Sequence, residues 1–270
     1  MNFAAAVLLG AIQGLTEFLP VSSSAHLILA RAFFGWEVPP EFGLAFDVAL
    51  HVGTLSAILL YFRAEIVGMT RSLPGIFSRA PDRPATLLRM IAIGTVPVVI
   101  IALAFNEYIE QVLRTPAVAA AALAVGALLM LIAERLGPRT RAEDSIGWWE
   151  SILIGCAQAA ALIPGMSRSG GTIAMGMFLG IRRDAAARFT FLLAIPAMLA
   201  AAAKEGMELT SMPLPDGTPW LLATGVVVSA VTGYVTIKYF LRFLAGHRLD
   251  VFAAYRLVLA AATIVWLLKR

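Results

Sequence analysis

The chain is poor in charged residues and in cysteine. Charged residues make up 14% of its 270 residues, whereas 60% are hydrophobic and the mean hydropathy is +0.83. So much apolar surface cannot be hidden in one globular core of this size, which excludes a soluble domain and predicts a polytopic membrane protein. The single cysteine, Cys156, excludes a disulfide within the chain, and its apolar neighbours predict that it is buried.

The excess of positive charge does not indicate a nucleic-acid partner. The net charge is +4 and the isoelectric point is about 9.6. The basic residues lie in short loops between apolar runs, which is the pattern that sets the topology of a membrane protein. We therefore expect membrane lipids, and no nucleic acid, around this chain.

Apolar segments of two kinds are present. About 20 apolar residues are needed to cross a hydrocarbon core of ~30 Å as a helix. Two regions, Phe3–Phe34 and Ile152–Ile181, are too long for one crossing and are broken near the middle by Pro, Ser and Gly. Irregular backbone at membrane depth needs protein or a water-filled cavity around it, so each region predicts a re-entrant helical hairpin. Six further segments predict single transmembrane helices: Phe46–Phe62, Leu87–Phe105, Ala117–Ala133, Phe189–Ala203, Trp220–Phe240 and Val251–Leu268.

The two breaks resemble each other in sequence. Gly10-x-x-Gln13 recurs as Gly155-x-x-Gln158, and Ser22-x-Ser24 recurs as Ser167-x-Ser169, both at an offset of 145 residues. The order is thus a hairpin and three crossings, then a hairpin and three crossings. Because three is odd, the second half must be inserted upside down. We predict an all-α polytopic membrane protein with an inverted-topology repeat, in which the two breaks face each other near the midplane.

The two halves are expected to be residues 1–137 and 145–270 of a single membrane domain spanning residues 1–270. This topology sends most basic residues to one face: Arg63, Arg71, Arg79, Arg83, Arg89, Arg135, Arg139, Arg141, Arg182, Arg183, Arg188, Lys238, Arg242 and Arg248. The other face receives Arg31, Arg114, Lys204, Lys269 and Arg270, with acidic residues such as Glu37 and Asp216. The basic face should be cytoplasmic, which places both termini outside.

The second break has the composition of an anion site. Arg168 lies among Gly165, Ser167, Ser169, Gly170, Gly171 and Thr172, ahead of a helical run. Glycines let backbone N–H groups approach an anion, hydroxyls donate to it, and a helix N-terminus adds a favourable dipole. Arginine supplies a planar fork for phosphate oxygens. We interpret Ser167, Arg168, Ser169, Gly171 and Thr172 as a phosphate or diphosphate site; the alternative is that Arg168 pairs with a carboxylate such as Glu17.

In the first break, Gln13 and Glu17 are four residues apart and project from one helical face. A charged group at this depth costs on the order of 2.5–3.5 kcal/mol, so it normally serves a site or is paired. Together the amide and the carboxylate are suited to a hard divalent cation, which would also bridge phosphate oxygens. The alternative is that Glu17 is only the counter-ion of Arg168, and the two interpretations can coexist.

The rest of the first break holds Ser22, Ser23, Ser24 and His26. A serine and a histidine in one short loop are suited to act as nucleophile and general base, or as general acid for a leaving group. The alternatives are helix capping for the serines and a structural role for His26. The spacing does not decide which serine would attack, and Ser22 and Ser24 are also candidates for binding the anion.

Four further polar residues lie outside the two breaks or beside them. Asp47 and His51 have the i, i+4 spacing of a proton relay or of part of a metal site, although a self-satisfied Asp–His pair fits equally well. Arg256 lies inside the last apolar span without a motif, and we expect it to pair structurally. Gln158 is interpreted as a vestigial counterpart of Gln13.

The two motifs, Gln13–His26 and Pro164–Thr172, resemble the signature motifs of the bacterial undecaprenyl-diphosphate phosphatases of the bacitracin-resistance type. The resemblance extends over the whole chain and includes Phe46–Thr54 and Phe191–Pro196. The family has Glu or Gln at the position of Gln13, so Glu17 is the only carboxylate of that pair here. Met166 occupies a place where the family often has Thr, so no hydroxyl is available there.

The resemblance implies hydrolysis of the C55 isoprenyl diphosphate to its monophosphate and inorganic phosphate. This reaction recycles the lipid carrier of cell-wall synthesis at the outer face of the bacterial inner membrane. The resemblance also implies dependence on a divalent metal, Mg or Ca, and functional roles for Glu17, Ser23, His26, Ser167, Arg168 and Thr172. The oligomeric state, including a homodimer, stays open.

Two other functions are alternatives to a phosphatase of this family. The inverted repeat by itself also fits a transporter or flippase of a phosphorylated lipid, which would release no inorganic phosphate. A type-2 phosphatidate phosphatase is excluded, because its Lys-Arg-Pro, Pro-Ser-Gly-His and downstream Arg–His–Asp elements are absent from the sequence.

Overall fold

The computed structural model describes residues 2–35, 40–209 and 218–269, and the long segments in these ranges are helices. Five helices are long and apolar enough to cross a membrane, or six if one bent pair counts as a single span, which confirms the predicted all-α polytopic class. The α-helices are α1 (Phe3–Phe18), α2 (Ser23–Phe34), α3 (Pro40–Tyr61), α4 (Arg63–Arg71), α5 (Arg83–Tyr108), α6 (Pro116–Leu136), α7 (Trp148–Ala160), α8 (Arg168–Phe178), α9 (Arg183–Leu209), α10 (Thr218–Leu244) and α11 (Asp250–Leu268).

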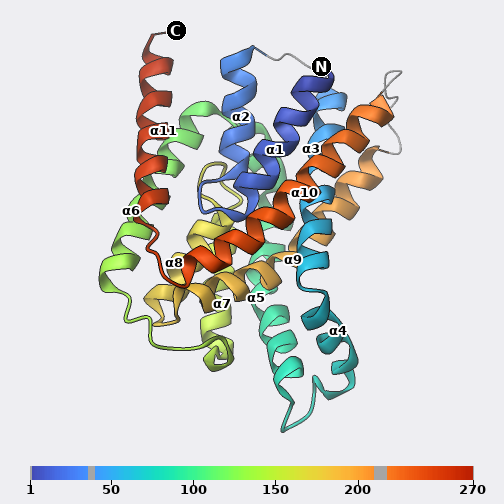
Figure 1. Cartoon of the computed structure of the whole chain (residues 1–270), viewed down its shortest axis with the longest axis vertical. Coiled ribbons are helices and arrows are strands. Elements are labelled where there is room, and N and C mark those ends of the chain that lie inside the picture. Colours follow the sequence, from blue (N-terminus) through green and yellow to red (C-terminus); the bar gives the residue numbers. More distant parts are fainter. Residues whose placement is uncertain (1, 36–39, 210–217, 270) are drawn as a thin grey trace.

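The six predicted crossings coincide with the long helices α3, α5, α6, α9, α10 and α11. The first crossing differs in one respect, because the chain bends by 73° between Tyr61 and Arg63 and continues as α4. The prediction treated this segment as one span that ends at Phe62. The run from Arg63 to Arg71 is more polar and amphipathic, and it projects from the lower end of the molecule in Figure 1.

Each predicted hairpin is a pair of short helices. The pairs are α1 with α2 and α7 with α8, and the longest of the four helices has 16 residues. At 1.5 Å per residue, none of them crosses a ~30 Å core alone. The element order therefore repeats, with a short pair and three long helices in each half. The inverted relation between the halves stays a prediction.

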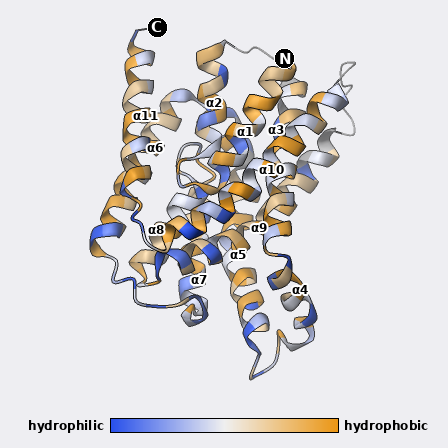
Figure 2. Cartoon of the chain, in the orientation of Figure 1, coloured by the Kyte–Doolittle hydropathy of each residue, from blue (hydrophilic) through white to orange (hydrophobic). Residues whose placement is uncertain are grey.

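Helices of the two halves pack against each other throughout the molecule. α10 lies against α3 and α1, α5 lies against α7, and α6 lies against α11. The central core includes rings from both halves, with Phe18 and Phe191 in edge-to-face contact at 5.4 Å. Apolar residues also cover the outer faces of the long helices, as Figure 2 shows for α10 and α11. In water such faces would be a liability, whereas in a bilayer they contact lipid.

A buried acidic side chain gathers several of the basic loops. The Glu134 carboxylate at the end of α6 is fully buried and accepts hydrogen bonds from Arg139 at 2.9 Å, from Arg183 at 2.6 and 2.7 Å, and from the backbone N–H of Leu249 at 2.8 Å. The end of α6, the start of α9 and the loop before α11 therefore meet. Figure 1 shows this region at the opposite end from the start of α1 and the end of α11.

The basic residues near Glu134 were all predicted to share one face. Of the residues assigned to the other face, Glu37, Asp216 and Arg270 lie outside the described residues. The prediction for Cys156 was wrong. Its side chain is exposed, because it projects from α7 into an apolar groove on the outside of the helix bundle.

Candidate active site

Both breaks end in a serine with the same unusual backbone conformation. Ser22 and Ser167 have φ values of 73° and 68°, in a region that residues other than glycine rarely adopt. Each is the N-cap of the following helix, and its hydroxyl accepts from the backbone N–H three residues later, that of Ala25 or of Gly170. Strain of this kind costs of order 1–3 kcal/mol and is concentrated at functional sites.

The two breaks contact each other, as the sequence predicted. The Ser169 hydroxyl of the second break donates to the carbonyl of Leu19 in the first at 2.9 Å. In the other direction, the Gly165 N–H donates to the Ser24 hydroxyl at 3.5 Å. An ion pair between Arg168 and Glu17 links the start of α8 to the end of α1. The ion pair and the two serine N-caps, which come from both halves of the chain, therefore lie close together.

Arg256 of α11 lies beneath this contact and is fully buried. Its guanidinium donates to the carbonyls of Pro20 in the first break and of Gly165 and Met166 in the second at 3.0–3.2 Å. It also donates to the carbonyls of Ala122 and Leu123 in α6. Arg256 therefore has the structural role that the sequence predicts, and its partners are backbone carbonyls. Gly126 provides the space, because a Cβ there would lie 2.0 Å from Arg256 Nη2.

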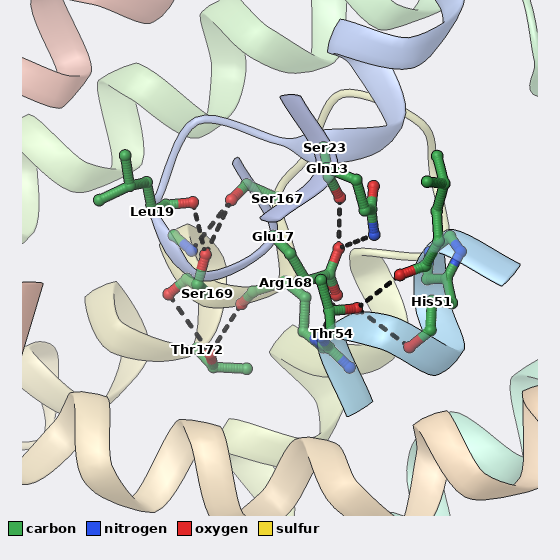
Figure 3. Close-up of polar contacts among 12 residues, drawn as sticks. Gln13, Glu17, Leu19, Ser23, His51, Thr54, Ser167, Arg168, Ser169 and Thr172 are labelled. Carbon is green, nitrogen blue, oxygen red and sulfur yellow. Dashed lines mark hydrogen bonds and ion pairs between the residues drawn. The ribbon is translucent and has the colours of Figure 1, made fainter. Parts of the chain in front are cut away.

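Glu17 is the centre of a polar cluster at the contact (Figure 3). Its Oε2 accepts from the Ser23 hydroxyl at 2.5 Å and from Gln13 Nε2 at 3.0 Å, while its Oε1 accepts from Arg168 Nη2. Glu17 is therefore the counter-ion of Arg168, and it also holds the Ser23 hydroxyl. Its role at a divalent cation stays a prediction. The short Ser23 contact places a carboxylate where a general base for that hydroxyl is needed.

A cavity of about 230 Å³ lies beside this cluster, between the two breaks and helices α3, α5, α7 and α9. Apolar side chains such as Val98 and Met198 form part of its wall. Its polar lining comes from both halves of the chain: Thr16, Glu17, Ser22, Ser23, Ser24, His51, Gln158, Ser167 and Arg168. Most of the predicted anion-binding residues are therefore brought together, along with His51 and Gln158.

Some predicted binding residues do not line the cavity. The Thr172 hydroxyl donates to the carbonyl of Arg168 at 2.7 Å, within its own helix, and the Ser169 hydroxyl is used by Leu19. Gly171 is likewise absent from the lining, one turn along α8. In the described structure these three residues shape and join the helix start, and direct contact with an anion stays a prediction for them.

His26 also lies outside the cavity lining. Its Nδ1 is 2.7 Å from the carbonyl of Ser22, which can only accept, so Nδ1 carries the proton. In that tautomer Nε2 accepts from the Tyr255 hydroxyl at 2.7 Å, and the two rings stack. Sequence reasoning missed Tyr255, because it is 229 residues away and has no motif around it. The proton-transfer role of His26 stays a prediction.

The predicted Asp47–His51 pair is divided between two places. The Asp47 carboxylate forms ion pairs with Arg31 and with Arg114. His51 uses its Nδ1 to donate to the Asp47 backbone carbonyl at 2.8 Å, and its ring lines the cavity. Only His51 is therefore placed to meet a ligand there, and the interpretation of a self-satisfied side-chain pair is wrong.

The described residues contain no group of three or more His, Cys, Asp or Glu side chains arranged to hold a metal ion. Glu17 is the one carboxylate among the residues lining the cavity. Beside it, the buried Oε1 of Gln13 has no hydrogen-bond partner in the described structure. One carboxylate and one free amide oxygen fit a cation such as Mg²⁺ that takes its other ligands from substrate phosphates and water. The predicted donors thus have the chemistry for such a cation, but only Glu17 lines the cavity, because Gln13 is fully buried beside it.

Comparison with known proteins identifies the family. The model of the family described as bacitracin resistance protein BacA matches residues 6–262. The chain belongs to this family. A relative from Rubrobacter xylanophilus named undecaprenyl-diphosphatase is 42% identical over 266 residues, covering 97% of both chains.

Other relatives carry the same name. One from Stutzerimonas stutzeri, named undecaprenyl-diphosphatase 2, is 43% identical over 270 residues and 98% of both chains. One from Chlorobium luteolum, named undecaprenyl-diphosphatase, is 42% identical over 278 residues, covering 99% of this chain and 98% of its own. These names describe a phosphatase, and nothing in the structure favours the transporter alternative.

Removal of the Arg256 guanidinium should loosen both breaks at once. Arg256→Met leaves carbonyls of Pro20, Gly165 and Met166 without this donor, at a cost of about 1–3 kcal/mol for each buried group left unsatisfied. We expect a clearly lower melting temperature of the purified protein in detergent. Arg182→Met, at an exposed position, is the control. An unchanged melting temperature for Arg256→Met would show that the breaks do not depend on Arg256.

Proposed function

We propose that this chain hydrolyses undecaprenyl diphosphate to undecaprenyl phosphate and inorganic phosphate, recycling the lipid carrier of cell-wall synthesis and conferring bacitracin resistance. The observation that carries the proposal is the meeting of Arg168, Glu17 and Ser23 at one cavity, from breaks 151 residues apart in sequence. A cationic fork and a hydroxyl held by a carboxylate are the parts that transfer of a phosphoryl group requires.

Arg168 binds the diphosphate in this proposal. One of its N–H groups is used by Glu17, and the side chain retains other donors in the wall of the cavity. These donors pair with oxygens of the terminal phosphate, and the hydroxyls of Ser22, Ser24 and Ser167 lie in the same wall. Charge spreads over these oxygens in the transition state, so Arg168 stabilises the transition state as well as the bound substrate.

Ser23 is the proposed nucleophile and Glu17 its base. The Ser23 oxygen attacks the terminal phosphorus and gives its proton to Glu17. The bond from that phosphorus to the bridging oxygen breaks, and Glu17 returns the proton to the departing monophosphate. Water then attacks the phosphorus of the phosphoserine and gives a proton to Glu17. The bond from phosphorus to the Ser23 oxygen breaks, Glu17 returns the proton to that oxygen, and inorganic phosphate leaves. The 2.5 Å contact between Ser23 and Glu17 supports the role of Glu17 as the base.

Glu17 and the Oε1 of Gln13 would hold a divalent cation, Mg or Ca, together with substrate oxygens. When bound, such a cation supplies charge neutralisation on the phosphate oxygens. Gln13 Nε2 donates to Glu17 and thereby fixes the direction of the carboxylate. The sequence carries Gln at the position where the family has Glu or Gln, so the cation site of this chain has one negative charge fewer than one with the Glu form.

The protein is proposed to lie in the bacterial inner membrane with its site open to the outer face. The support is the clustering of basic loops at one end of the molecule, around Glu134, since basic loops favour the cytoplasmic side. The start of α1 and the end of α11 lie at the other end, which would be periplasmic.

The proposed activity predicts phosphate release by the purified protein from undecaprenyl diphosphate, with loss of activity in a metal chelator. Arg168→Lys should lower kcat/KM roughly 10²- to 10³-fold, because an ammonium cannot replace the guanidinium fork. Arg182→Lys, at an exposed ion pair, should retain activity and serves as the matched control. No phosphate release by the wild type would refute the function, and near-normal turnover by Arg168→Lys would refute the role of Arg168.

Substitution of Ser23 separates the two modes of attack. If Ser23 is the nucleophile, Ser23→Ala should have only background activity, and acid-quenched wild-type enzyme should carry a phosphoryl group on Ser23 detectable by mass spectrometry. Full activity of Ser23→Ala would instead mean that water attacks phosphorus directly. The alanine variant should keep a melting temperature close to that of the wild type, because Ser23 is only half-buried and the helix is capped by Ser22.

A further inference from the structure

An apolar groove runs along the outside of the bundle between α5 and α7. It has a volume of about 720 Å³ and continues past the end of α5 to Leu113. Its walls are almost entirely hydrocarbon, with Ile100 and Phe105 on α5 and Ile152 on α7 as typical members. Ile100 and Phe105 are 58% and 52% exposed, so the groove is open along the side of a membrane-spanning helix. We call it the α5–α7 groove.

The α5–α7 groove adjoins the polar cavity. Leu162, just after α7, lines both spaces. On either side of it the chain alternates, since Gln158 and Ala161 face the cavity while Ala160 and Ile163 face the groove. A molecule whose phosphates lie beside Arg168 can therefore extend into the groove by passing Leu162.

We infer that the α5–α7 groove binds the polyprenyl chain of the substrate over the isoprene units nearest the diphosphate. This inference rests on the proposed function, which supplies an anionic head joined to a long apolar chain. The polar cavity and the adjoining hydrocarbon walls, which have Leu162 in common, match those two parts in order. A C55 chain is longer than the groove, so its remainder lies among the membrane lipids.

In this inference the groove positions the polyprenyl chain by its shape. Lipid tails are as apolar as the groove, so moving the chain out of the bilayer yields little hydrophobic free energy. Close packing against Ile100 and Leu162 instead fixes the position of the chain and hence of the phosphate at its end. Filling the groove should therefore impair long-chain substrates and spare a diphosphate with almost no chain.

The test uses a bulky substitution on α5 and the single cysteine. Ile100→Trp should raise KM for undecaprenyl diphosphate roughly ten-fold by overpacking the groove, with KM for a C5 diphosphate unchanged. Val99→Trp, next to it on α5 and outside the groove lining, is the control. In the wild type, undecaprenyl phosphate should slow alkylation of Cys156, whereas inorganic phosphate should not.

Each contrary result has a distinct meaning. Equal effects of Ile100→Trp on both substrates, or no protection of Cys156, would overturn the inference. Oxidative crosslinking of two chains through Cys156, unaffected by the lipid, would also overturn it and assign the groove to a second copy of this chain. Protection of Cys156 does not require turnover, so a protein that binds the lipid without hydrolysing it would refute the proposed function alone.

A second inference comes from Gln158, independently of the groove. Gln158 is 2% exposed and lines the polar cavity, yet neither its Nε2 nor its Oε1 has a hydrogen-bond partner in the described structure. A buried amide without partners is unfavourable, and such groups in native proteins require an explanation. Its counterpart Gln13 uses Nε2 to orient Glu17, so the two halves have different uses for this position.

We propose that Gln158 binds the diphosphate by donating Nε2–H to a phosphate oxygen. It stands in the same wall as Arg168 and Ser167, and a neutral donor adds a directed contact without further positive charge. The interpretation of Gln158 as a vestige of the repeat is thereby replaced by a role in substrate binding. This inference also rests on the proposed function.

Gln158→Met keeps the size of the side chain and removes its polar atoms. We expect KM for undecaprenyl diphosphate to rise roughly ten-fold or more, since hydrogen bonds to charged groups are the stronger ones. The melting temperature of the substrate-free protein should stay the same or rise, because an unsatisfied buried amide is gone. Gln158→Glu should lose more activity, because it places a negative charge beside the phosphate. Gln111→Met, at an exposed position, is the control.

A binding role of Gln158 predicts a higher KM without a lower melting temperature, whereas a structural role predicts a lower melting temperature. A fall in melting temperature of Gln158→Met together with unchanged KM would show that Gln158 is structural and overturn the inference. Unchanged KM and unchanged stability would overturn it as well. If the wild type releases no phosphate, binding of inorganic diphosphate, weaker in Gln158→Met than in the wild type, would still support the contact and refute only the proposed function.

Discussion

The buried guanidinium of Arg256 is the constraint on which the rest of the site depends. A break between helices inside a membrane protein leaves carbonyl groups that helix geometry does not satisfy. Arg256 donates to Pro20 in one break and to Gly165 and Met166 in the other. The cost of a cation inside the membrane and the cost of the free carbonyls offset each other. Because one side chain serves both breaks, their relative position is fixed by the last helix of the chain.

Arg256 holds the two breaks together, and each break supplies different functional groups to the site. The serine caps Ser22 and Ser167 give each break the same strained turn, yet the residues next to them differ. The first break supplies the carboxylate of Glu17 and the hydroxyl that it holds, and the second supplies Arg168. A site assembled in this way is complete only when both halves are folded, and its polar groups are shielded from lipid by the surrounding helices.

The sequence predicted the parts of this structure that depend on local composition. The six crossings and the two broken helix pairs follow from apolar run length and from the Pro, Ser and Gly residues near Pro20 and Pro164. The contact of the breaks was predicted from the repeated order of these segments. Long-range partners were not predictable. Nothing near His26 indicates Tyr255, and nothing near Asp47 indicates Arg114. A hydroxyl residue in a motif can face the cavity or donate to a carbonyl of its own helix, as Thr172 does, and the motif alone does not distinguish the two.

The ion pair of Glu17 and Arg168 makes the resting cavity nearly neutral, so a ligand at the proposed site meets a guanidinium that is already shared with a carboxylate. Gln13 donates to the same carboxylate and holds it in place. The anion is therefore attracted by the N–H groups of Arg168 that Glu17 leaves free, and not by a full unpaired positive charge. The proposed diphosphate carries more negative charge than the monophosphate product and is attracted more strongly. The pair that stabilises the empty site thus also limits how tightly the product is held, which favours its departure.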